Sequence, residues 1–410
     1  MNIFLVNQYS GNKGDRAVLY AMCRILKARY PNAGITVATS NPDLWIGYSY
    51  YQHEDIRFVP WAWDYDNVSA AKVYWKILNK IKKYTFTTMR ETFLNGLSIA
   101  RYFTNPDFYD ALVKADVVIS VGGHHFTTLL SKDLVSGINF DAMSILSQKP
   151  MICFSQSFGP FEFYNERNRK LTQKLLSKCI LMPRENNSQE CLKKFIGDGA
   201  NVIPTFESVL SLSEFIEYKS IDKRDNAIGI AIYCTQYRTS EEKSTYQKTL
   251  AKFCDYVISK GYNVRFFPME IKGTGPDDRP FINEIISKTL APEKCSVYFE
   301  DLETQDHLNE VSKCKVFLGH KTHSTIFALA TGTPLMAMAY HPKTLEFLTQ
   351  FGMTENVIVD TKLSIEWLTE TFDRISSSLE SISKNEYAKS VDFTNRIKED
   401  IFKAINIVTK

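Results

Sequence analysis

Short apolar runs alternate with longer amphipathic stretches along this chain, and the alternation occurs twice. In the first half the apolar runs predict strands at 2–7, 35–39, 56–59, 116–120, 151–155, 179–182 and 201–203. In the second half they predict strands at 227–232, 263–267, 297–299, 315–318, 335–339 and 356–358. Apolar positions at helical spacing predict helices, notably at 15–29, 139–147, 165–177 and 187–195. Strands that alternate with helices are typical of βαβ units and a parallel sheet.

The stretch between the two halves is the predicted linker. Residues 214–226 carry seven charged side chains and little apolar content. We therefore expect an N-terminal Rossmann-like domain over 1–213 and a C-terminal one over 227–385, α/β in class, with parallel sheets that face each other across a cleft. A C-terminal helix is expected over 386–410, packing back on the first domain. The length of 410 residues agrees with two domains, because it exceeds what one core usually fills.

Composition and charge narrow the possible partners. A net charge of +3 is too small to indicate a nucleic-acid binder, which normally shows a strong basic field. The eight cysteines form no CxxC pair and mostly lie in apolar runs, so we expect buried free thiols in a reducing compartment and no zinc or other metal site. No run of about 18 apolar residues occurs. We therefore expect a cytoplasmic protein that does not span a membrane.

The most informative string is Gly319-His320-Lys321-Thr322-His323-Ser324, which lies between a predicted strand and a predicted helix. Strand ends that lead into helices are where open α/β sheets bind ligands. Lys321 and His323 would lie near backbone N–H groups at a helix N-terminus, which suits an anion. The plainer alternative is a solvated lysine with a packed or capping imidazole at His320 or His323.

A glycine-rich turn also follows the first predicted strand. It contains Asn12, a cleft-lining candidate, and Asp15, which could act as a base or orient a substrate. Asp15 could equally cap the helix that follows. The turn lacks the GxGxxG pattern of a dinucleotide site.

Three further turns follow predicted strands. Gly122, Gly123 and His124 form a second glycine turn and are possible cleft-lining residues, although the pattern favours packing as their role. Arg184 ends a strand, where its planar fork suits a carboxylate or phosphate, unless it forms an internal salt bridge with Glu185. Lys343 follows the strand at 335–339 in the same way.

Taken in order, these turns resemble the polysaccharide pyruvyl transferase family over about residues 1–350. The resemblance is carried by the Gly-Asn-Lys-Gly-Asp turn at 11–15, the Gly-Gly turn at 122, Ser157-Phe158-Gly159-Pro160, Arg184, His320 to His323, Ala330 to Pro334 and Tyr340-His341-Pro342-Lys343. It implies a GT-B-like fold and transfer of the pyruvyl (enolpyruvyl) group of phosphoenolpyruvate onto a sugar as a ketal, in capsular or exopolysaccharide biosynthesis. The chain departs from the family at Lys321, where members often have arginine.

The resemblance also implies roles for single residues. Arg184, His323 and Lys343 match positions that the family uses for donor binding and catalysis, and we expect Lys321 to bind the donor with them. Protonating the methylene carbon of an enol phosphate needs an acid, and imidazole titrates near neutral pH, so His323 is the expected general acid. Asp15 and His124 are candidates for the base. Phosphoenolpyruvate would be a co-substrate, and no cofactor is expected.

Two other functions stay open on the sequence alone. One is a GT-B glycosyltransferase that uses a nucleotide sugar, since one fold serves many reactions. The other is a glycan-binding protein of the same fold without activity. A basic face with Lys72, Lys76, Lys80 and Lys83 could bring the protein to a membrane that carries a lipid-linked acceptor, or could simply be solvated.

Overall fold

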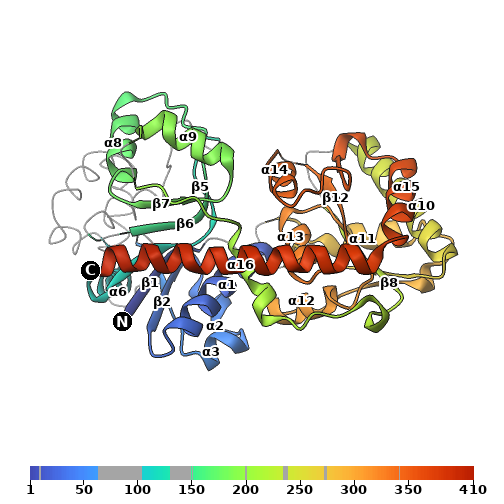
Figure 1. Cartoon of the computed structure of the whole chain (residues 1–410), viewed down its shortest axis with the longest axis horizontal. Coiled ribbons are helices and arrows are strands. Elements are labelled where there is room, and N and C mark those ends of the chain that lie inside the picture. The colour runs from blue at the N-terminus through green and yellow to red at the C-terminus, as the bar shows by residue number, and fades with distance from the viewer. Residues whose placement is uncertain are drawn as a thin grey trace, which may run out of the picture. The chain divides into compact units, whose positions relative to one another are not determined.

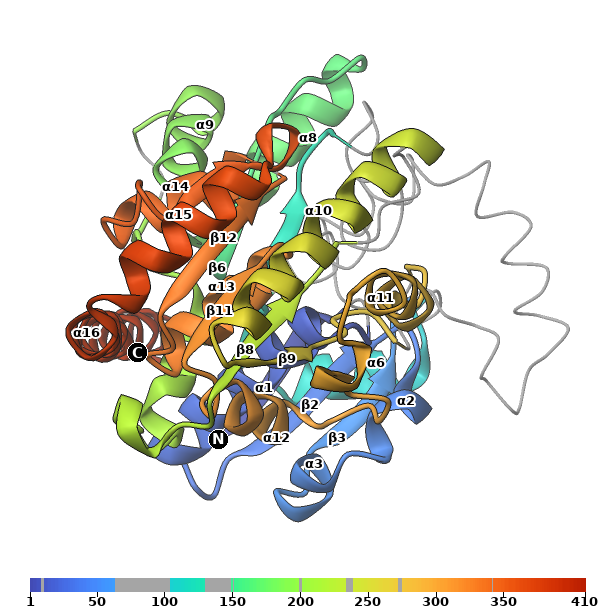
Figure 2. The ribbon, with the colours of Figure 1, turned by 90° about the vertical axis from the view of Figure 1, so that its right-hand side faces the viewer.

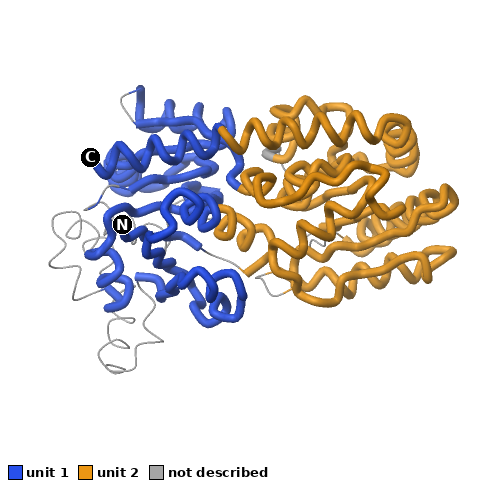
Figure 3. Tube along the Cα trace, turned by 60° about the horizontal axis from the view of Figure 1, so that its bottom comes forward, with its two compact units in different colours: residues 1–9, 22–208, 396–410 blue, residues 10–21, 209–395 orange. Residues whose placement is uncertain are grey.

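A computed structural model of the chain describes residues 1–8, 11–62, 104–129, 149, 151–198, 201–233, 239–271, 275–340 and 342–410. Within these ranges the chain forms two compact units (Figure 3). Unit 1 comprises residues 1–9, 22–208 and 396–410, and unit 2 comprises residues 10–21 and 209–395. Each unit is an α/β structure around one parallel sheet, as the alternating pattern predicts.

The sheet of unit 1 has the strand order β3-β2-β1-β4-β6, with β5 and β7 also paired to β6. Every one of these pairs is parallel. Its strands are β1 (Asn2–Gln8), β2 (Gly34–Thr39), β3 (Arg57–Pro60), β4 (Val117–Ser120), β5 (Gly123–Phe126), β6 (Met151–Phe158) and β7 (Ile180–Pro183). Its described helices are the later part of α1 (Lys13–Arg29), α2 (Pro42–Ile46), α3 (Ser49–His53), α6 (Pro106–Lys114), α8 (Glu166–Leu176), α9 (Asn186–Ile196) and the end of α16 (Leu379–Thr409) (Figure 1).

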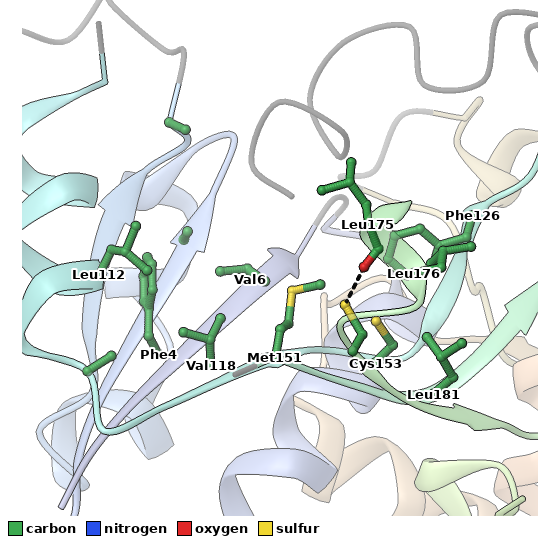
Figure 4. Close-up of a cluster of buried hydrophobic side chains, with 14 of the residues drawn as sticks. Phe4, Val6, Leu112, Val118, Phe126, Met151, Cys153, Leu175, Leu176 and Leu181 are labelled. Atoms are coloured by element: carbon green, nitrogen blue, oxygen red, sulfur yellow. Dashed lines mark hydrogen bonds between the residues drawn. The ribbon is translucent and has the colours of Figure 1, made fainter. Parts of the chain in front are cut away.

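One face of the unit 1 sheet packs against α6, α8 and α9. The alternate residues Phe4 and Val6 of β1 point into this core, which also contains Leu112 of α6 and Leu175 of α8 (Figure 4). Burying each such side chain stabilises the fold by about 1.5–3 kcal/mol. The core therefore holds the strands in register and presents their carboxyl ends along one edge.

The sheet of unit 2 has the order β10-β9-β8-β11-β12-β13, again all parallel. Its strands are β8 (Ala227–Ala231), β9 (Asn263–Phe266), β10 (Cys295–Val297), β11 (Val316–Gly319), β12 (Leu335–Ala339) and β13 (Val357–Val359). Its helices are α10 (Ser240–Ser259), α11 (Asp278–Ile286), α12 (Thr304–Val311), α13 (Thr322–Ala330), α14 (Pro342–Gln350), α15 (Ile365–Ser376), the start of α1 and the first part of α16 (Figure 2). Four short 3-10 helices also occur in the described residues, at Ser208–Phe215, Ile221–Lys223, Pro292–Lys294 and Asp360–Lys362.

Helices cover both faces of this second sheet. Ile228 and Ile230 of β8 share a core with α10, α11 and α15. On the opposite face Gly229 leaves room for the ring of Phe317, because a Cβ at residue 229 would lie 2.5 Å from that ring. The strand order reverses between β8 and β11, which makes their carboxyl ends the topological switch point where such sheets bind ligands.

Each predicted strand except that at 201–203 overlaps a strand of the structure, although the strand predicted at 297–299 is observed at Cys295–Val297 and the one predicted at 151–155 extends to Phe158. Residues 201–203 form only an isolated bridge at Val202, because the pairing with Leu181 is not extended. The segment 123–126, predicted as part of a glycine turn, is strand β5, which pairs with the end of β6. The predicted helix at 139–147 lies outside the described residues. The predicted linker at 214–226 and the domain bounds stay predictions, and Ser208–Phe215 and Ile221–Lys223 are 3-10 helices.

Candidate functional site

The string at 319–324 forms the predicted strand-turn-helix. Strand β11 ends at Gly319, Lys321 is the N-cap residue of α13 with an extended backbone, and the helix begins at Thr322. Glycine is required at the turn, because a Cβ at residue 319 would lie 2.8 Å from Cγ2 of Thr325 and 3.0 Å from Oγ of Ser324. The first turn of α13 therefore lies directly above the end of β11, at the switch point.

His323 packs against the first turn of α1, which belongs to the same unit. A Cβ placed on Gly14 would lie 2.4 Å from Nδ1 and 2.7 Å from Cγ of the imidazole. Only a residue without a side chain permits this approach. The backbone at Gly14 thereby fixes where the half-buried imidazole can lie.

Asn12 and Asp15 form a reciprocal pair at the start of α1. The backbone N–H of Asp15 donates to Oδ1 of Asn12 at 2.9 Å, and the Asn12 amide donates to Oδ2 of Asp15 at 3.0 Å. This is the geometry of a helix cap in which Asn12 is the capping residue. The helix begins at Lys13 and not at residue 15, so Asp15 is in its first turn and is not itself the cap.

Lys321 forms an internal ion-pair cluster. Its Nζ lies 3.3 Å from Oδ2 of Asp278 and 3.8 Å from Oε2 of Glu270. Asp278 is buried, and its Oδ2 also accepts the backbone N–H groups of Met269 and Glu270 at 2.9 and 2.8 Å. Burial raises the pKa of the Asp278 carboxyl, although Lys321 and the two N–H groups act in the opposite direction. The charge of Lys321 is therefore balanced by protein carboxylates.

His320 lies beneath this turn and is completely buried. Its Nδ1 lies 2.8 Å from the hydroxyl of Tyr246 on α10, and its Nε2 lies 3.5 Å from Oδ2 of Asp360, which follows β13. The rings of Tyr233 and Tyr340 also contact the imidazole, with centroid separations of 5.7 and 6.1 Å. His320 is therefore a packed imidazole, which is the alternative that the sequence left open.

Lys343 follows β12 as the sequence predicts, and it is the second residue of α14. Its side chain and His341 lie outside the part of the chain that the structure describes.

Arg184 directly follows β7 in unit 1 and is held by acceptors from three segments. Its Nε donates to Oγ of Ser157 and to Oε1 of Glu185, both at 3.1 Å, and its Nη1 donates to Glu207. Burial acts to lower the pKa of the guanidinium, but the carboxylates of Glu207 and Glu185 together raise it above its usual value. The internal salt bridge that the sequence left open is therefore present, and donor binding by Arg184 stays a prediction.

Gly122 is buried at the end of β4, and Gly123 and His124 open strand β5. Nε2 of His124 lies 2.6 Å from the backbone oxygen of Gly159. Gly123 is required where it stands, because a Cβ there would lie 2.3 Å from Nε2 of His125. Within the described residues these groups are packed in unit 1, and their cleft-lining role is not tested.

A network of polar side chains connects the carboxyl ends of β1, β4 and β6, and the sequence pattern did not predict it. The amide of Asn7 donates to Oγ of Ser120 at 2.7 Å, and the amide of Gln156 donates to the same oxygen at 3.0 Å. Asn7 and Ser155 adopt left-handed backbone conformations, with φ of 67° and 51°. Such strain outside glycine is uncommon and concentrates at functional sites.

The partners of the cations were also missed. Asp278 and Glu270 lie 43 and 51 positions from Lys321 in the chain, so no local pattern connects them to it. Asp301, which pairs with the buried Lys13 and Arg16, lies still farther from its partners along the chain. Of the carboxylates named here, only Glu185 lies next to its cation, Arg184, in the sequence, so only this pair could be predicted from it.

Comparison of the whole sequence with known proteins identifies one family. Residues 12–342 match the family described as polysaccharide pyruvyl transferase. The chain belongs to this family. The amylovoran biosynthesis protein AmsJ of Erwinia amylovora is similar to it over 99% of this chain and 100% of AmsJ, with 23% identity.

Solved structures show that the fold is GT-B-like. The UDP-GlcNAc 2-epimerase of Neisseria meningitidis, bound to UDP-GlcNAc, has a TM-score of 0.57 at 13% identity, over 98% of this chain and 99% of that one. The MnaA protein of S. aureus, solved with UDP, has the same TM-score and identity over 100% and 98% of the two chains. At this identity the likeness concerns the fold alone.

Among the described residues, no group of three or more His, Cys, Asp or Glu side chains is placed to hold a metal ion. None of the helices they form is both long enough and apolar enough to cross a membrane. The predicted basic helical face at 72–83 lies outside the described residues.

Proposed function

We propose that the protein transfers the pyruvyl group of phosphoenolpyruvate onto two hydroxyls of a sugar, forming a ketal, during capsular or exopolysaccharide biosynthesis in the cytoplasm. Membership of the polysaccharide pyruvyl transferase family supports the transferase class. Similarity to a protein of amylovoran biosynthesis supports the polysaccharide context. The acceptor is proposed to be a saccharide, free or lipid-linked, and phosphoenolpyruvate is the co-substrate without a further cofactor.

The observation that carries the proposal is the placement of His323. This imidazole lies in the first turn of a helix at the switch point of the unit 2 sheet, and the close approach of Gly14 restricts its position. A general acid must be held within reach of one atom of the substrate, so a restricted imidazole suits the task.

The proposed reaction begins with a proton. His323 donates it to the methylene carbon of phosphoenolpyruvate, the carbon–carbon double bond supplies the electrons, and the adjacent carbon becomes cationic. A sugar hydroxyl attacks that carbon and loses its proton to a base, for which Asp15 is the proposed residue. A second hydroxyl then attacks the same carbon and closes the ketal, while the bond from that carbon to the phosphate oxygen breaks and the leaving phosphate takes the hydroxyl's proton. Exchange with solvent returns the first proton from the base to His323. The products are the pyruvylated sugar and phosphate.

Anion binding at Lys321 requires an exchange of partners. Of its two carboxylates, Glu270 is the more distant, at 3.8 Å from Nζ. We propose that a donor oxygen replaces Glu270 while Asp278 keeps the ammonium in place. Lysine has no bidentate fork, so it would act as a point charge on the donor. Arg184 and Lys343 stay proposed donor-binding residues.

Mass spectrometry tests the reaction directly. The purified protein is incubated with phosphoenolpyruvate and candidate acceptor glycans, including lipid-linked ones. The expected product has gained one pyruvic acid less one water, and inorganic phosphate is released. Transfer of a glycosyl group from a nucleotide sugar, with no reaction of phosphoenolpyruvate, would overturn the proposal.

Replacing His323 tests its role as the acid. The variant His323→Ala should lose roughly 100-fold or more in kcat, because general acid catalysis contributes about 10²–10⁴-fold. Its thermal unfolding should stay close to that of the parent protein. His53→Ala, at an exposed histidine, is the matched control and should keep full activity. Ketal formation at the parent rate in the His323 variant would remove the mechanism.

A methyl group at Gly14 tests the position of the imidazole without removing it. In Gly14→Ala the new Cβ must displace the His323 ring, so kcat should fall about tenfold or more, since small displacements of catalytic groups are costly. Gly47→Ala is the control, because nothing lies within 4 Å of a Cβ there. Unchanged kcat in Gly14→Ala would show that the placement of the ring does not matter.

A further inference from the structure

A separate cavity of about 590 Å³ lies in unit 2, at the carboxyl ends of its strands. The first turns of α10 form one wall, with Glu241 and Thr245, and the turns that follow β12 and β13 form the other, with Tyr340 and Asp360. The volume falls within the range of small-molecule sites, about 300–1,000 Å³. Neither the sequence pattern nor the family resemblance assigns a ligand to it.

We propose that this cavity binds a neutral sugar ring of the acceptor glycan. This proposal extends the proposed function, and it rests on that function only in taking the sugar to be part of the acceptor. It places a sugar-binding site in unit 2, which also contains His323 and Lys321.

Charge on the walls disfavours an anionic ligand. The described lining includes three carboxylates, those of Glu241, Glu242 and Asp360, and among the described lining residues none is lysine or arginine. Phosphoenolpyruvate, a sugar phosphate or a nucleotide would bring further negative charge to these groups. A neutral polyol brings hydroxyl donors, and an ionised carboxylate is purely an acceptor.

The aromatic residues of the cavity suit the apolar face of a sugar ring. Tyr340 is 39% exposed, and its ring lies 4.5 Å, centroid to centroid, from that of Tyr233. Tyrosine offers an apolar ring together with a hydroxyl, which matches a ligand with an apolar face and a polar rim. Thr245 and Thr249, one turn apart on α10, add hydroxyl groups to the opposite wall.

An organic cation is the competing ligand for carboxylates and aromatic rings. The Tyr233 ring, however, already has the ammonium of Lys321 at 5.7 Å from its centroid. A second cation beside it would meet repulsion from that charge. The threonine hydroxyls also suit a hydrogen-bonding ligand better than a cation.

The walls are fixed before any ligand binds. Tyr246 is tied through its hydroxyl to the buried His320, which also faces Asp360. The start of α10 carries a capping box between Thr239 and Glu242, whose backbone and side-chain groups bond reciprocally at 2.7 and 3.2 Å. A site with preorganised walls spends less free energy on ordering when it binds.

Two tryptophan variants on one helix test the cavity. Thr245→Trp fills it, and Lys252→Trp places the same side chain on an exposed part of α10 outside the lining. The parent protein and both variants are applied to a printed array of neutral glycans, with choline and phosphoenolpyruvate as soluble competitors. We expect the parent protein and Lys252→Trp to bind at least one neutral glycan, and Thr245→Trp to bind it at least about tenfold more weakly. Neither competitor should displace the glycan.

Truncating Tyr340 gives a second measurement. Tyr340→Ala should weaken binding to the same glycan about tenfold, in the range of aromatic residues at the centre of a binding site. Absence of neutral-glycan binding by the parent protein, equal binding by Thr245→Trp, or displacement by choline would each overturn the proposal.

The two proposals can fail separately. If glycan binding is lost in Thr245→Trp while no glycan gains mass with phosphoenolpyruvate, the sugar site stands and the proposed reaction fails. If glycans gain mass and the KM for the acceptor is unchanged in Thr245→Trp, the reaction stands and the sugar site fails.

Discussion

The carboxyl edges of the two sheets are built differently. In unit 1, the pairing shifts register near the ends of β1 and β6, and Asn7 and Ser155 are left-handed there. In unit 2, the described strands pair without a shift up to their ends. Backbone groups that leave the ladder need other hydrogen-bond partners, and side chains are one source of them. Unit 1 therefore ends in an amide and hydroxyl network, whereas unit 2 ends in regular turns that carry titratable groups.

The predicted donor-binding cations differ in the same way. Arg184 holds Ser157, Glu185 and Glu207 at once, because a guanidinium presents five donors in one plane. Lys321 faces Asp278 and Glu270 at 3.3–3.8 Å, longer than close charge-assisted bonds. The comparison indicates that Arg184 is chiefly fixed by the fold, whereas Lys321 can change partners more readily.

The largest effect on stability is expected in unit 1. Arg184→Ala leaves two buried carboxylates without their cation, which should lower the free energy of unfolding by about 3–5 kcal/mol. Denaturant unfolding would measure this loss. The double variant Arg184→Met with Glu207→Gln should recover part of it, since one uncompensated charge is also removed. A single variant as stable as the parent would break the distinction between the two cations.

A smaller, pH-dependent effect is expected in unit 2. Burial raises the folded-state pKa of Asp278 above 3.8, so the stability linked to its proton is fully present below pH 3.8 and is lost as the pH rises through the folded-state value. Lys321→Ala removes a group that opposes this shift. The variant should match the parent in acid and fall behind it by about 1–3 kcal/mol towards neutral pH.

Thermal unfolding across that pH range would measure the difference. Lys288→Ala, at an exposed lysine, serves as the control and should show no growing gap. A gap between Lys321→Ala and the parent that shrinks as the pH rises would contradict the expected direction.

The smallest effect concerns the buried imidazole. Tyr246→Phe removes the hydroxyl that lies 2.8 Å from Nδ1 of His320 and should cost about 1 kcal/mol in the free energy of unfolding. Tyr262→Phe, on the ring that packs against Phe372, is the matched control. Equal stability of both variants would show that the contact between Tyr246 and His320 contributes nothing to the fold.

Local pattern was enough to predict most strands of both sheets. The boundaries of β12 were predicted to the residue, because buried parallel strands are continuous apolar runs. Strand β5 was missed, because Gly123-His124-His125 has neither β-branched residues nor alternation, and its pairing with β6 supplies what local propensity lacks.

The site was less accessible to sequence reasoning. The position of Lys321 at a strand end followed from the pattern, but its carboxylate partners come from segments brought close only by the fold. The contact of His323 with Gly14 depends on α1 entering unit 2, which no motif at either position indicates. The catalytic role of His323 and the donor contacts stay predictions.

Residues 396–410 belong to unit 1, although they are the last part of α16. During synthesis on the ribosome, unit 1 therefore lacks a piece of its own structure until residues 396–410 emerge. Domains generally fold as units, with the N-terminal domain first. In this chain unit 1 cannot finish folding first, because all of unit 2 is synthesised before residues 396–410 complete unit 1.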